Sequence, residues 1–309
     1  MDIPLQKIKK GLRNPREIIM EINARYQWWK MGKRYNPNGV DIFSQDWDIL
    51  IILDALRADD FMMLNDLPGQ VTTKESRGGG TIEFLEGNIK DRDLSDVVYV
   101  TGNPQYEANA NQMNTQFHKV EQVWKTDWDS ELKTVLPKTM SKATICAAEQ
   151  YPNKRILSHF VQPHEPFIGE TAKRHELSGW IDPEKKITGR EIFEESMKNL
   201  FRQYDTELYR KAYRENIEIA LPHVQTILKN VAGKIVVTSD HGEMFGERAR
   251  PIPIRYDSHR IGCHVPSLLK VPWLEYTNGE RRQTVKGETE KQLDASDDVN
   301  DRLKQLGYL

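Results

Sequence analysis

Acidic and imidazole side chains follow two apolar segments of the sequence at the point where each segment ends. Residues 235–237 are Ile-Val-Val and lead into Asp240 and His241, while residues 49–53 are Ile-Leu-Ile-Ile-Leu and lead directly into Asp54. Short apolar runs of this kind predict buried strands. A carboxylate oxygen beside an imidazole nitrogen suits a divalent metal such as Zn²⁺ or Mn²⁺, so the sequence predicts a metal site where these strands end.

Each acidic residue also has a purely structural interpretation. Asp240 could bond the backbone of a turn with Gly242 at positive φ, and Asp54 could be the N-cap of a helix that follows its strand. The repetition favours the metal site. In an open α/β sheet ligands bind at the carboxyl ends of the strands, and two carboxylates brought to that edge repel each other unless a cation lies between them.

A run of three glycines, residues 78–80, precedes a short helical segment that begins at Thr81. The N-terminus of a helix favours an anion, because its backbone N–H groups are free. A hydroxyl at that position, beside a bound metal, is suited to attack a phosphoryl group. A plain N-cap is the alternative, but Phe84 stands where a capping box would have Glu or Gln.

A third predicted strand, residues 155–161, is followed by a histidine and an acidic residue held between two prolines. His164 and Glu165 are that pair, so a third strand also ends in polar side chains. His159 lies inside the strand and is interpreted as a core histidine whose hydrogen bonds are satisfied. Further along, His259 and His264 follow Asp240 at a short distance in the sequence.

The composition excludes several classes of protein. The chain has 309 residues with 44 Lys and Arg against 46 Asp and Glu, a net charge of -2, whereas a nucleic-acid binder usually carries a basic excess. Two cysteines do not make a disulfide framework. The longest aliphatic run, residues 49–53, is far shorter than a membrane helix, and no signal-peptide pattern is visible. We therefore expect a cytoplasmic protein.

The remaining segments predict an α/β protein organised in three parts. A long helix over residues 193–228 feeds the strand at 234–239, which is the α/β crossover pattern. Further strands are predicted at 97–101 and 267–271, helix and loop at 105–150, a variable insertion or lid at 170–195, a loose segment at 274–296 and a short helix at 297–309. We expect a helical arm over residues 1–40, a catalytic domain over 41–275 and a C-terminal segment with a docking helix over 276–309.

The N-terminal arm has two interpretations. Residues 5–12 and 18–26 have apolar side chains at helical spacing, with Ile18, Ile22 and Tyr26 on one face of the second helix. Basic residues accompany these faces, so the arm could bind a membrane surface. The apolar faces are thin, which favours an arm packed against the main body instead.

Four stretches together carry a resemblance to a known family. They are DWDILIILDALRAD, VTSDHGEMFGE, HVPSLLKVPW and DRLKQLGYL. Their order and content resemble the alkaline phosphatase superfamily, and more closely its sulfatase-like branch. The resemblance implies an α/β fold with a large central sheet, mostly parallel but mixed, and helices on both faces. It also implies one or two divalent ions, with Zn²⁺ or Mn²⁺ favoured and Ca²⁺ as an alternative.

The resemblance also assigns roles to individual residues. Asp54, Asp240 and His241 match the ligands of one metal. Thr81 matches the nucleophile, which also contacts that metal. The last two matches, His164 and His259, correspond to residues that either bind a second metal or contact the group being transferred.

One departure from the family pattern bears on the activity. Members that hydrolyse sulfate esters generally have Cys or Ser at the nucleophile, within a Cys/Ser-x-Pro-x-Arg motif that is converted to formylglycine. This chain has Thr81 followed by Ile-Glu-Phe-Leu, and threonine cannot give that aldehyde. The resemblance therefore favours a metal-dependent phosphoester hydrolase or phosphotransferase with a phospho-threonine intermediate.

The substrate implied by this resemblance is a small-molecule, glycan-linked or lipid-linked phosphate or sulfate ester. Two alternative functions stay open. One is sulfate-ester hydrolysis, and the other is a catalytically silent member that binds a metal and an anion.

Overall fold

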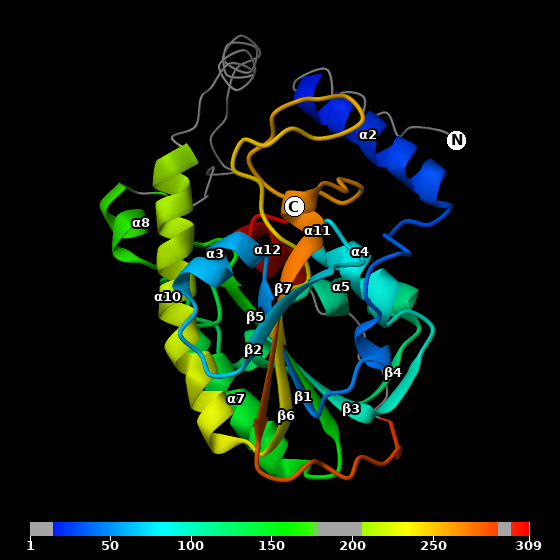
Figure 1. The fold of residues 1–309 in the computed structure, drawn as a ribbon, viewed down its shortest axis with the longest axis vertical. Coiled ribbons are helices and arrows are strands. Elements are labelled where there is room, and N and C mark those ends of the chain that lie inside the picture. Colours follow the sequence, from blue (N-terminus) through cyan, green and yellow to red (C-terminus); the bar gives the residue numbers. More distant parts are fainter. Residues whose placement is uncertain (1–14, 176, 178–205, 290–297, 309) are drawn as a thin grey trace.

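A seven-stranded sheet runs through the middle of the molecule (Figure 1). The computed structural model describes residues 15–175, 177, 206–289 and 298–308. The strands are β1 (Ile49–Asp54), β2 (Gln70–Glu75), β3 (Asp93–Thr101), β4 (Gln116–Gln122), β5 (Arg155–Pro163), β6 (Gly233–Thr238) and β7 (Lys270–Asn278). They lie in the order β2-β7-β6-β1-β5-β3-β4. The pairs from β6 to β4 are all parallel, whereas β7 is antiparallel to both of its neighbours.

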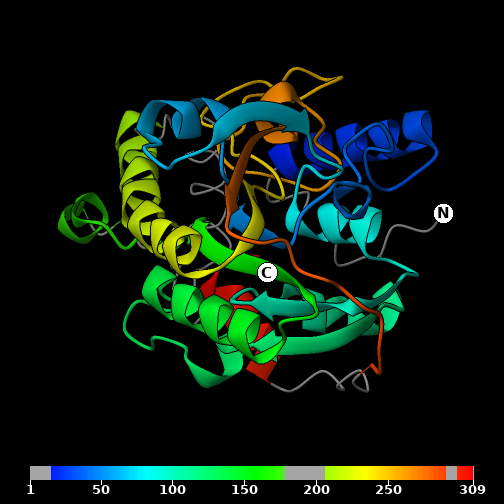
Figure 2. The same cartoon turned by 60° about the horizontal axis from the view of Figure 1, so that its bottom comes forward.

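Helices cover both faces of this sheet, as Figures 1 and 2 show. The helices that surround it are α2 (Pro15–Met31), α3 (Ala58–Leu64), α4 (Thr81–Asn88), α5 (Gln105–Met113), α6 (Val123–Thr126), α7 (Pro137–Gln150), α8 (Glu170–His175), α10 (Thr206–Asn230), α11 (Pro266–Leu269) and α12 (Asp298–Gln305), together with the 3₁₀ turn η1 (Ile42–Ser44). The predicted α/β fold, with a large mixed sheet between helices, is confirmed.

Two hydrophobic clusters hold the helices to the sheet, and strand β1 contributes to both. Ile51 and Leu53 belong to the cluster that includes side chains of α3, α7, α10 and α12. Leu50 and Ile52 belong to the opposite cluster, which includes side chains of α4 and α5. Every residue of β1 is buried, because a parallel strand covered on both faces has no solvent side. This explains why β1 reads as a continuous apolar run.

The structure corrects the prediction for the segment after residue 265. Residues 266–269 form helix α11, which has Pro266 in its first turn, where proline is favoured. The predicted strand at 267–271 is therefore displaced, and β7 extends to Asn278 through residues that were expected to be loose. Leu274 is buried while Glu275 is exposed, and this alternation made a half-buried strand look polar. Pro272 is tolerated because β6 pairs with β7 only up to Trp273.

Two strands have no counterpart in the sequence prediction. Strands β2 and β4 are the edge strands of the sheet, and most of their residues are exposed or only partly buried. The prediction of helix and loop over 105–150 is thus wrong for β4. The expected helices at 5–12 and 193–205 and most of the expected insertion lie outside the described residues. In the part of the chain that the structure describes, no helix combines the length and apolarity needed to cross a membrane.

Helix α2 packs against the body, but through a face other than the predicted one. Met20 is buried in a cluster with residues of the loop and helix at 244–268. The expected contact residues Ile18, Ile22 and Tyr26 are 42%, 48% and 40% exposed. Asn23 donates to the carbonyl of Ile252 at 3.0 Å, on the packed side. The arm is thus held by a mixture of apolar packing and hydrogen bonds.

Candidate metal centre and active site

Two carboxylates and two imidazoles converge at the carboxyl ends of the three central strands. Asp54 is the last residue of β1, Asp240 and His241 follow β6, and His159 lies in β5. The register explains the convergence, since Ile52 of β1 lies opposite His159 on one side and Thr238 on the other. All four side chains are fully buried. Parallel pairing therefore brings together residues that are far apart in the sequence.

The carboxylate of Asp54 is held by the protein through one oxygen only. Its Oδ2 accepts hydrogen bonds from Nδ2 of Asn103 at 2.6 Å and from the hydroxyl of Tyr308 at 2.7 Å. Its Oδ1 has no hydrogen-bond partner among the described residues. A buried polar atom without a partner is costly, which makes the free oxygen a candidate for binding a ligand.

Asp240 shows the same asymmetry. Its Oδ1 accepts from the backbone N–H of Ala55 at 3.1 Å and from that of His241 at 2.9 Å. Its Oδ2 is buried and has no hydrogen-bond partner within the ranges described. Both carboxylates therefore present one free oxygen to the same enclosed space.

The backbone carbonyl of the next residue fixes which ring nitrogen of His241 carries the proton. Its Nδ1 lies 2.7 Å from the carbonyl oxygen of Gly242, and a carbonyl oxygen can only accept, so Nδ1 carries the proton. The unprotonated Nε2 lies 3.5 Å from Oδ1 of Asp54 and 3.4 Å from Oδ2 of Asp240. It also lies 3.3 Å from Oγ1 of Thr81. Ligands of a tetrahedral zinc ion, at bonds of about 2.0 Å, are roughly 3.3 Å apart, so these atoms fit around one ion.

His159 belongs to this group, contrary to its interpretation as a satisfied core histidine. Its Nδ1 is 2.9 Å from the hydroxyl of Tyr99, but its Nε2 has no hydrogen-bond partner in the described chain. That nitrogen lies 3.8 Å from Oδ2 of Asp54 and 3.7 Å from Oδ2 of Asp240. Asp54, His159 and Asp240 together form a group that could hold a metal ion. With His241, these residues make up the metal group. A single polar residue inside an apolar strand was the sequence signal for it.

Burial and mutual repulsion shift the pKa values of this group. Burial, and then the charge of Asp240, raise the pKa of Asp54 well above its usual value. Burial alone would raise the pKa of Asp240, but the imidazoles of His241 and His159 lower it. Burial lowers the pKa of His159 to about 4 and also lowers that of His241. The histidines are therefore neutral near pH 7, which is the form that binds a metal.

Thr81 begins helix α4 beside these residues. Its side chain is buried. The N-cap residue is Gly80, so no side chain caps the helix. The glycine run lets this loop approach the segment around Cys263. A Cβ atom on Gly79 would lie 2.3 Å from the carbonyl oxygen of Cys263, so any larger residue would displace the loop. The glycines thus allow the loop to pack closely against the Cys263 segment, and this packing positions Thr81.

Glu83, on the first turn of α4, fixes the same loop through a full set of hydrogen bonds. It accepts from Nε1 of Trp28 at 2.8 Å and from the backbone N–H groups of Gly262 and Gly79 at 2.7 and 2.9 Å. Nε2 of His264 lies 3.1 Å from Oε2, the same oxygen that accepts from Gly79. This carboxylate ties α2, the glycine run and the 259–265 segment together. His264 is therefore a partner of Glu83 and not of the metal group.

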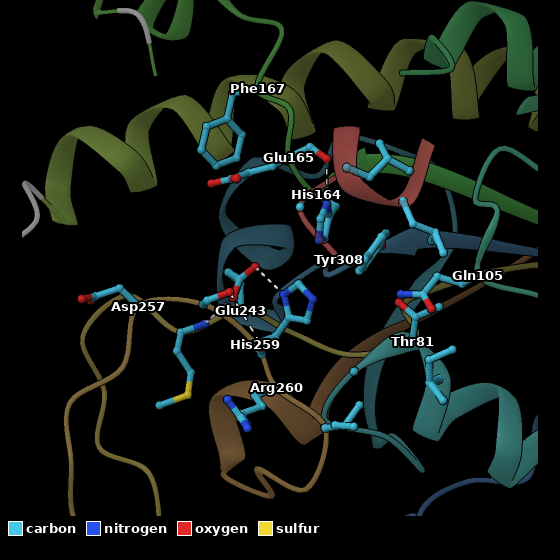
Figure 3. A pocket seen from close by; sticks show the side chains of 18 of the residues that line it. Thr81, Gln105, His164, Glu165, Phe167, Glu243, Asp257, His259, Arg260 and Tyr308 are labelled. Carbon is cyan, nitrogen blue, oxygen red and sulfur yellow. Dashed lines mark hydrogen bonds and ion pairs between the residues drawn. The ribbon is translucent and has the colours of Figure 1, made fainter. Parts of the chain in front are cut away.

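A cavity of about 750 Å³ opens over Thr81 (Figure 3). His164 and His259 both line it, and their rings are 4.9 Å apart. Nδ1 of His164 donates to the carbonyl of Glu165 at 2.7 Å, which leaves its Nε2 free. Nδ1 of His259 lies 3.0 Å from Oε2 of Glu243, and its ring is 4.4 Å from that of His241.

The cavity walls are electrostatically unusual. Burial lowers the pKa of His164 to about 3 and that of His259 to about 4. Burial raises the pKa of Glu243 to about 7, and burial together with Glu243 raises that of Glu165 to about 7. Perturbed values of this kind cluster at functional sites.

The structure thus divides the predicted site residues into two groups. Asp54, Thr81, Asp240 and His241 meet in one enclosed place, and their roles as ligands and nucleophile stay predictions. His164 and His259 line the cavity together with Thr81, and their roles also stay predictions. The residues that sequence reasoning missed are His159, Asn103 and Tyr308. The last two have no local sequence signal, since their contacts with Asp54 depend entirely on the fold.

Comparison with known proteins gives matches of structure only. No protein-family model and no curated protein matches the sequence. The C-terminal periplasmic domain of EptC from Escherichia coli, in complex with Zn, matches at 13% identity over 78% of this chain and 75% of that chain, with a TM-score of 0.48. A protein in the alkaline phosphatase superfamily from Vibrio parahaemolyticus matches at 13% identity over 76% of this chain and 60% of that chain, with a TM-score of 0.43. The phosphonate monoester hydrolase SpPMH from Silicibacter pomeroyi matches at 13% identity over 85% and 73%, with a TM-score of 0.40.

One of these structures is described as a protein in the alkaline phosphatase superfamily, which is the superfamily that the sequence motifs resemble. At 13% identity the likeness concerns the fold, so the chemistry of the site rests on this chain's own residues. The same comparison contradicts the expectation of a cytoplasmic protein, because the matched EptC structure is a periplasmic domain. The cytoplasmic assignment is therefore withdrawn.

Proposed function

We propose that this protein is a metal-dependent phosphoester hydrolase or phosphotransferase in which Thr81 is the nucleophile. One observation carries the proposal. The unprotonated Nε2 of His241 lies within 3.5 Å of Oδ1 of Asp54, Oδ2 of Asp240 and Oγ1 of Thr81. The two carboxylate oxygens are buried and without hydrogen-bond partners in the described part of the chain. A cation satisfies all of these atoms at once.

The ligands we assign to that ion are Asp54, His159, Asp240 and His241. Two imidazoles with two carboxylates suit Zn²⁺ or Mn²⁺ better than Ca²⁺, which takes about six to eight oxygen ligands. The orphaned carboxylate oxygens and the free Nε2 of His159 support this assignment. A divalent ion there supplies positive charge that lowers the pKa of the Thr81 hydroxyl and stabilises charge on a phosphoryl oxygen.

The rest of the mechanism combines side chains of the protein with solvent water. Oγ1 of Thr81 loses its proton to water and forms a bond to phosphorus while the ester P–O bond breaks, and the leaving oxygen takes up a proton. Water, or an acceptor hydroxyl, then cleaves the phospho-threonine and regenerates Thr81. The unprotonated Nε2 of His164 can accept a proton from that incoming group. His259 is the second candidate for this role, because it lies between His164 and His241.

The cavity supports an ester larger than a simple phosphate. Pockets for small molecules commonly measure about 300–1,000 Å³, and this one, at about 750 Å³, falls within that range. A small-molecule phosphate ester, or the head group of a glycan-linked or lipid-linked one, is the substrate class we propose. A silent binding protein would not need His164 and His259 beside Thr81, and Figure 3 shows all three around the same cavity.

The test combines metal content with turnover. Purified protein is analysed for metal by mass spectrometry and assayed with chromogenic phosphodiesters, phosphomonoesters and sulfate esters after addition of Zn²⁺ or Mn²⁺. We expect about one equivalent of metal, turnover of a phosphoester, and a phosphorylated peptide that contains residue 81. Turnover of sulfate esters alone would select the sulfatase alternative.

The nucleophile is tested by Thr81→Ala, which should keep the metal but lower turnover by about a thousandfold or more. Thr226→Ala is the matched control, because among the described contacts that exposed hydroxyl bonds only the carbonyl of Pro222 in its own helix. Thr81→Ala with near-normal turnover would show that Thr81 is not the nucleophile. Metal-free protein that stays inactive with every added ion would favour the binding function.

A further inference from the structure

The C-terminal segment reaches the centre of the candidate active site. Helix α12 is anchored by Val299 and Leu303, which are buried in the cluster beneath α7 and α10. After the helix the chain turns at Gly307, whose φ of +79° favours glycine, and the N–H of Tyr308 donates to the carbonyl of Leu303 at 2.9 Å. The turn directs Tyr308 into the cavity, where Figure 3 shows it between His164 and Thr81.

Tyr308 contacts four of the residues discussed above. Its hydroxyl donates to Oδ2 of Asp54 at 2.7 Å and accepts from Nδ2 of Asn103 at 2.9 Å. Its ring stacks on that of His164, with centroids 4.7 Å apart and an angle of 26° between the planes. It also meets the ring of His259 edge-on, at 6.2 Å. The residue therefore bridges the metal group and the wall of the cavity.

These contacts have a consequence for Asp54. A carboxylate can rotate and present either oxygen, or both, to a metal ion. Two donors, from Asn103 and Tyr308, engage Oδ2. The other oxygen, Oδ1, is left facing His241 at 3.5 Å. Groups that hold a ligand in this way typically change metal affinity by about 10- to 100-fold when they are removed.

We infer that Tyr308 is a positioning residue, which orients Asp54 so that Oδ1 alone is presented to the metal. The C-terminal segment is thus a part of the active site and not merely a packing element. This inference rests on the proposed function, because it requires Asp54 to be a ligand. The role of Asn103 is complementary, since its amide donates to both Asp54 and Tyr308.

The test uses Tyr308→Phe in the full chain, stripped of metal with a chelator and then titrated with Zn²⁺ against a chromogenic competitor. Phenylalanine keeps the ring that stacks on His164 and removes only the hydroxyl. We expect about tenfold weaker Zn²⁺ binding and an altered visible spectrum of the Co²⁺ form. Lys304→Ala is the control from the same segment, since its exposed side chain pairs only with Asp301 among the described contacts, and it should bind Zn²⁺ like the wild type.

Hydrogen exchange over residues 298–308 separates the hydroxyl from the docking of the segment. Weaker Zn²⁺ binding with unchanged exchange supports the inference. Unchanged Zn²⁺ affinity overturns it, as does slower turnover at unchanged affinity, because the hydroxyl would then act other than through Asp54. Weaker binding together with faster exchange also counts against it, since docking would then set the affinity. Failure of the proposed function looks different, because the wild-type protein itself would then bind no ion.

Discussion

Two sets of buried carboxylates among the described residues differ in their hydrogen bonding. Glu83 and Asp60, which are not among the ligands assigned to the metal, are fully provided with donors. Glu83 accepts from two backbone N–H groups and from Nε1 of Trp28, with His264 beside it. Asp60 is completely buried, and both Arg210 and Arg214 reach it, the latter at 2.7 Å. At the ends of β1 and β6, by contrast, each buried carboxylate has one oxygen without a hydrogen-bond partner in the described part of the chain.

This difference in hydrogen bonding suggests two roles for a buried carboxylate, one structural and one in binding a cation. A carboxylate that leaves water must recover its lost hydration from other partners, or folding is disfavoured. Glu83 recovers it from protein groups, and the result is a rigid junction between α2, α4 and the 259–265 segment. Asp54 and Asp240 recover it only in part from the described residues, and under the proposed function a bound cation completes their environment. The proposed function therefore predicts that substitutions in the two sets have different effects.

The largest effect should follow from Asp240→Asn. The Asn oxygen can still accept from Ala55 and His241, so the free energy of unfolding of the metal-free protein should change by less than about 1 kcal/mol. The metal should be lost, and turnover should fall by about a thousandfold, because a bound ion supplies several kcal/mol of charge stabilisation. Metal analysis, turnover and denaturant unfolding measure the three quantities. Retention of the metal at wild-type stoichiometry would show that Asp240 is not a required ligand, and the contrast with Glu83 would then not hold.

The sequence predicts the central strands of the sheet well and the edge strands poorly. Strands β1, β5 and β6 are central and covered on both faces, so they read as apolar runs, and the placement of Asp54 and Asp240 at their ends follows from parallel pairing. The edge strands β2 and β4 are largely exposed and give no such run. Exposure explains why both were missed.

Contacts across the fold explain the other omissions. Tyr308 and Asp54 are 254 positions apart, and nothing near either residue indicates the other. His159 was visible as a histidine in an apolar strand, but only the neighbouring β1 decides whether its ring meets a carboxylate or a hydroxyl. The sequence therefore predicts which element carries a ligand better than it predicts what holds that ligand in place.

A smaller effect is expected from Glu83→Gln, which should lower stability and leave metal binding intact. The new amide N–H₂ would face donors, either Trp28 and Gly262 or Gly79 and His264, and buried donors would lose their acceptor. We expect the free energy of unfolding to fall by about 3 kcal/mol, with the metal content per folded molecule unchanged. Chemical denaturation and metal analysis measure both. If the variant had normal stability but had lost its metal, Glu83 would contribute to metal binding. It would then not differ in role from Asp54 and Asp240.

The smallest effect should come from Trp28→Phe, which removes one of the donors to Glu83 and leaves the carboxylate in place. Phenylalanine lacks the indole N–H, but Oε1 of Glu83 keeps its hydrogen bond from Gly262 at 2.7 Å. The loss of one hydrogen bond should lower the free energy of unfolding by about 1 kcal/mol. Trp29→Phe is the control, because that neighbouring side chain is 79% exposed and should change stability little. If Trp28→Phe cost as much as Glu83→Gln, the stability of this junction would come from the packing of the indole ring on the 259–265 segment. The completeness of the hydrogen-bond set around Glu83 would then not be what distinguishes it from Asp54 and Asp240.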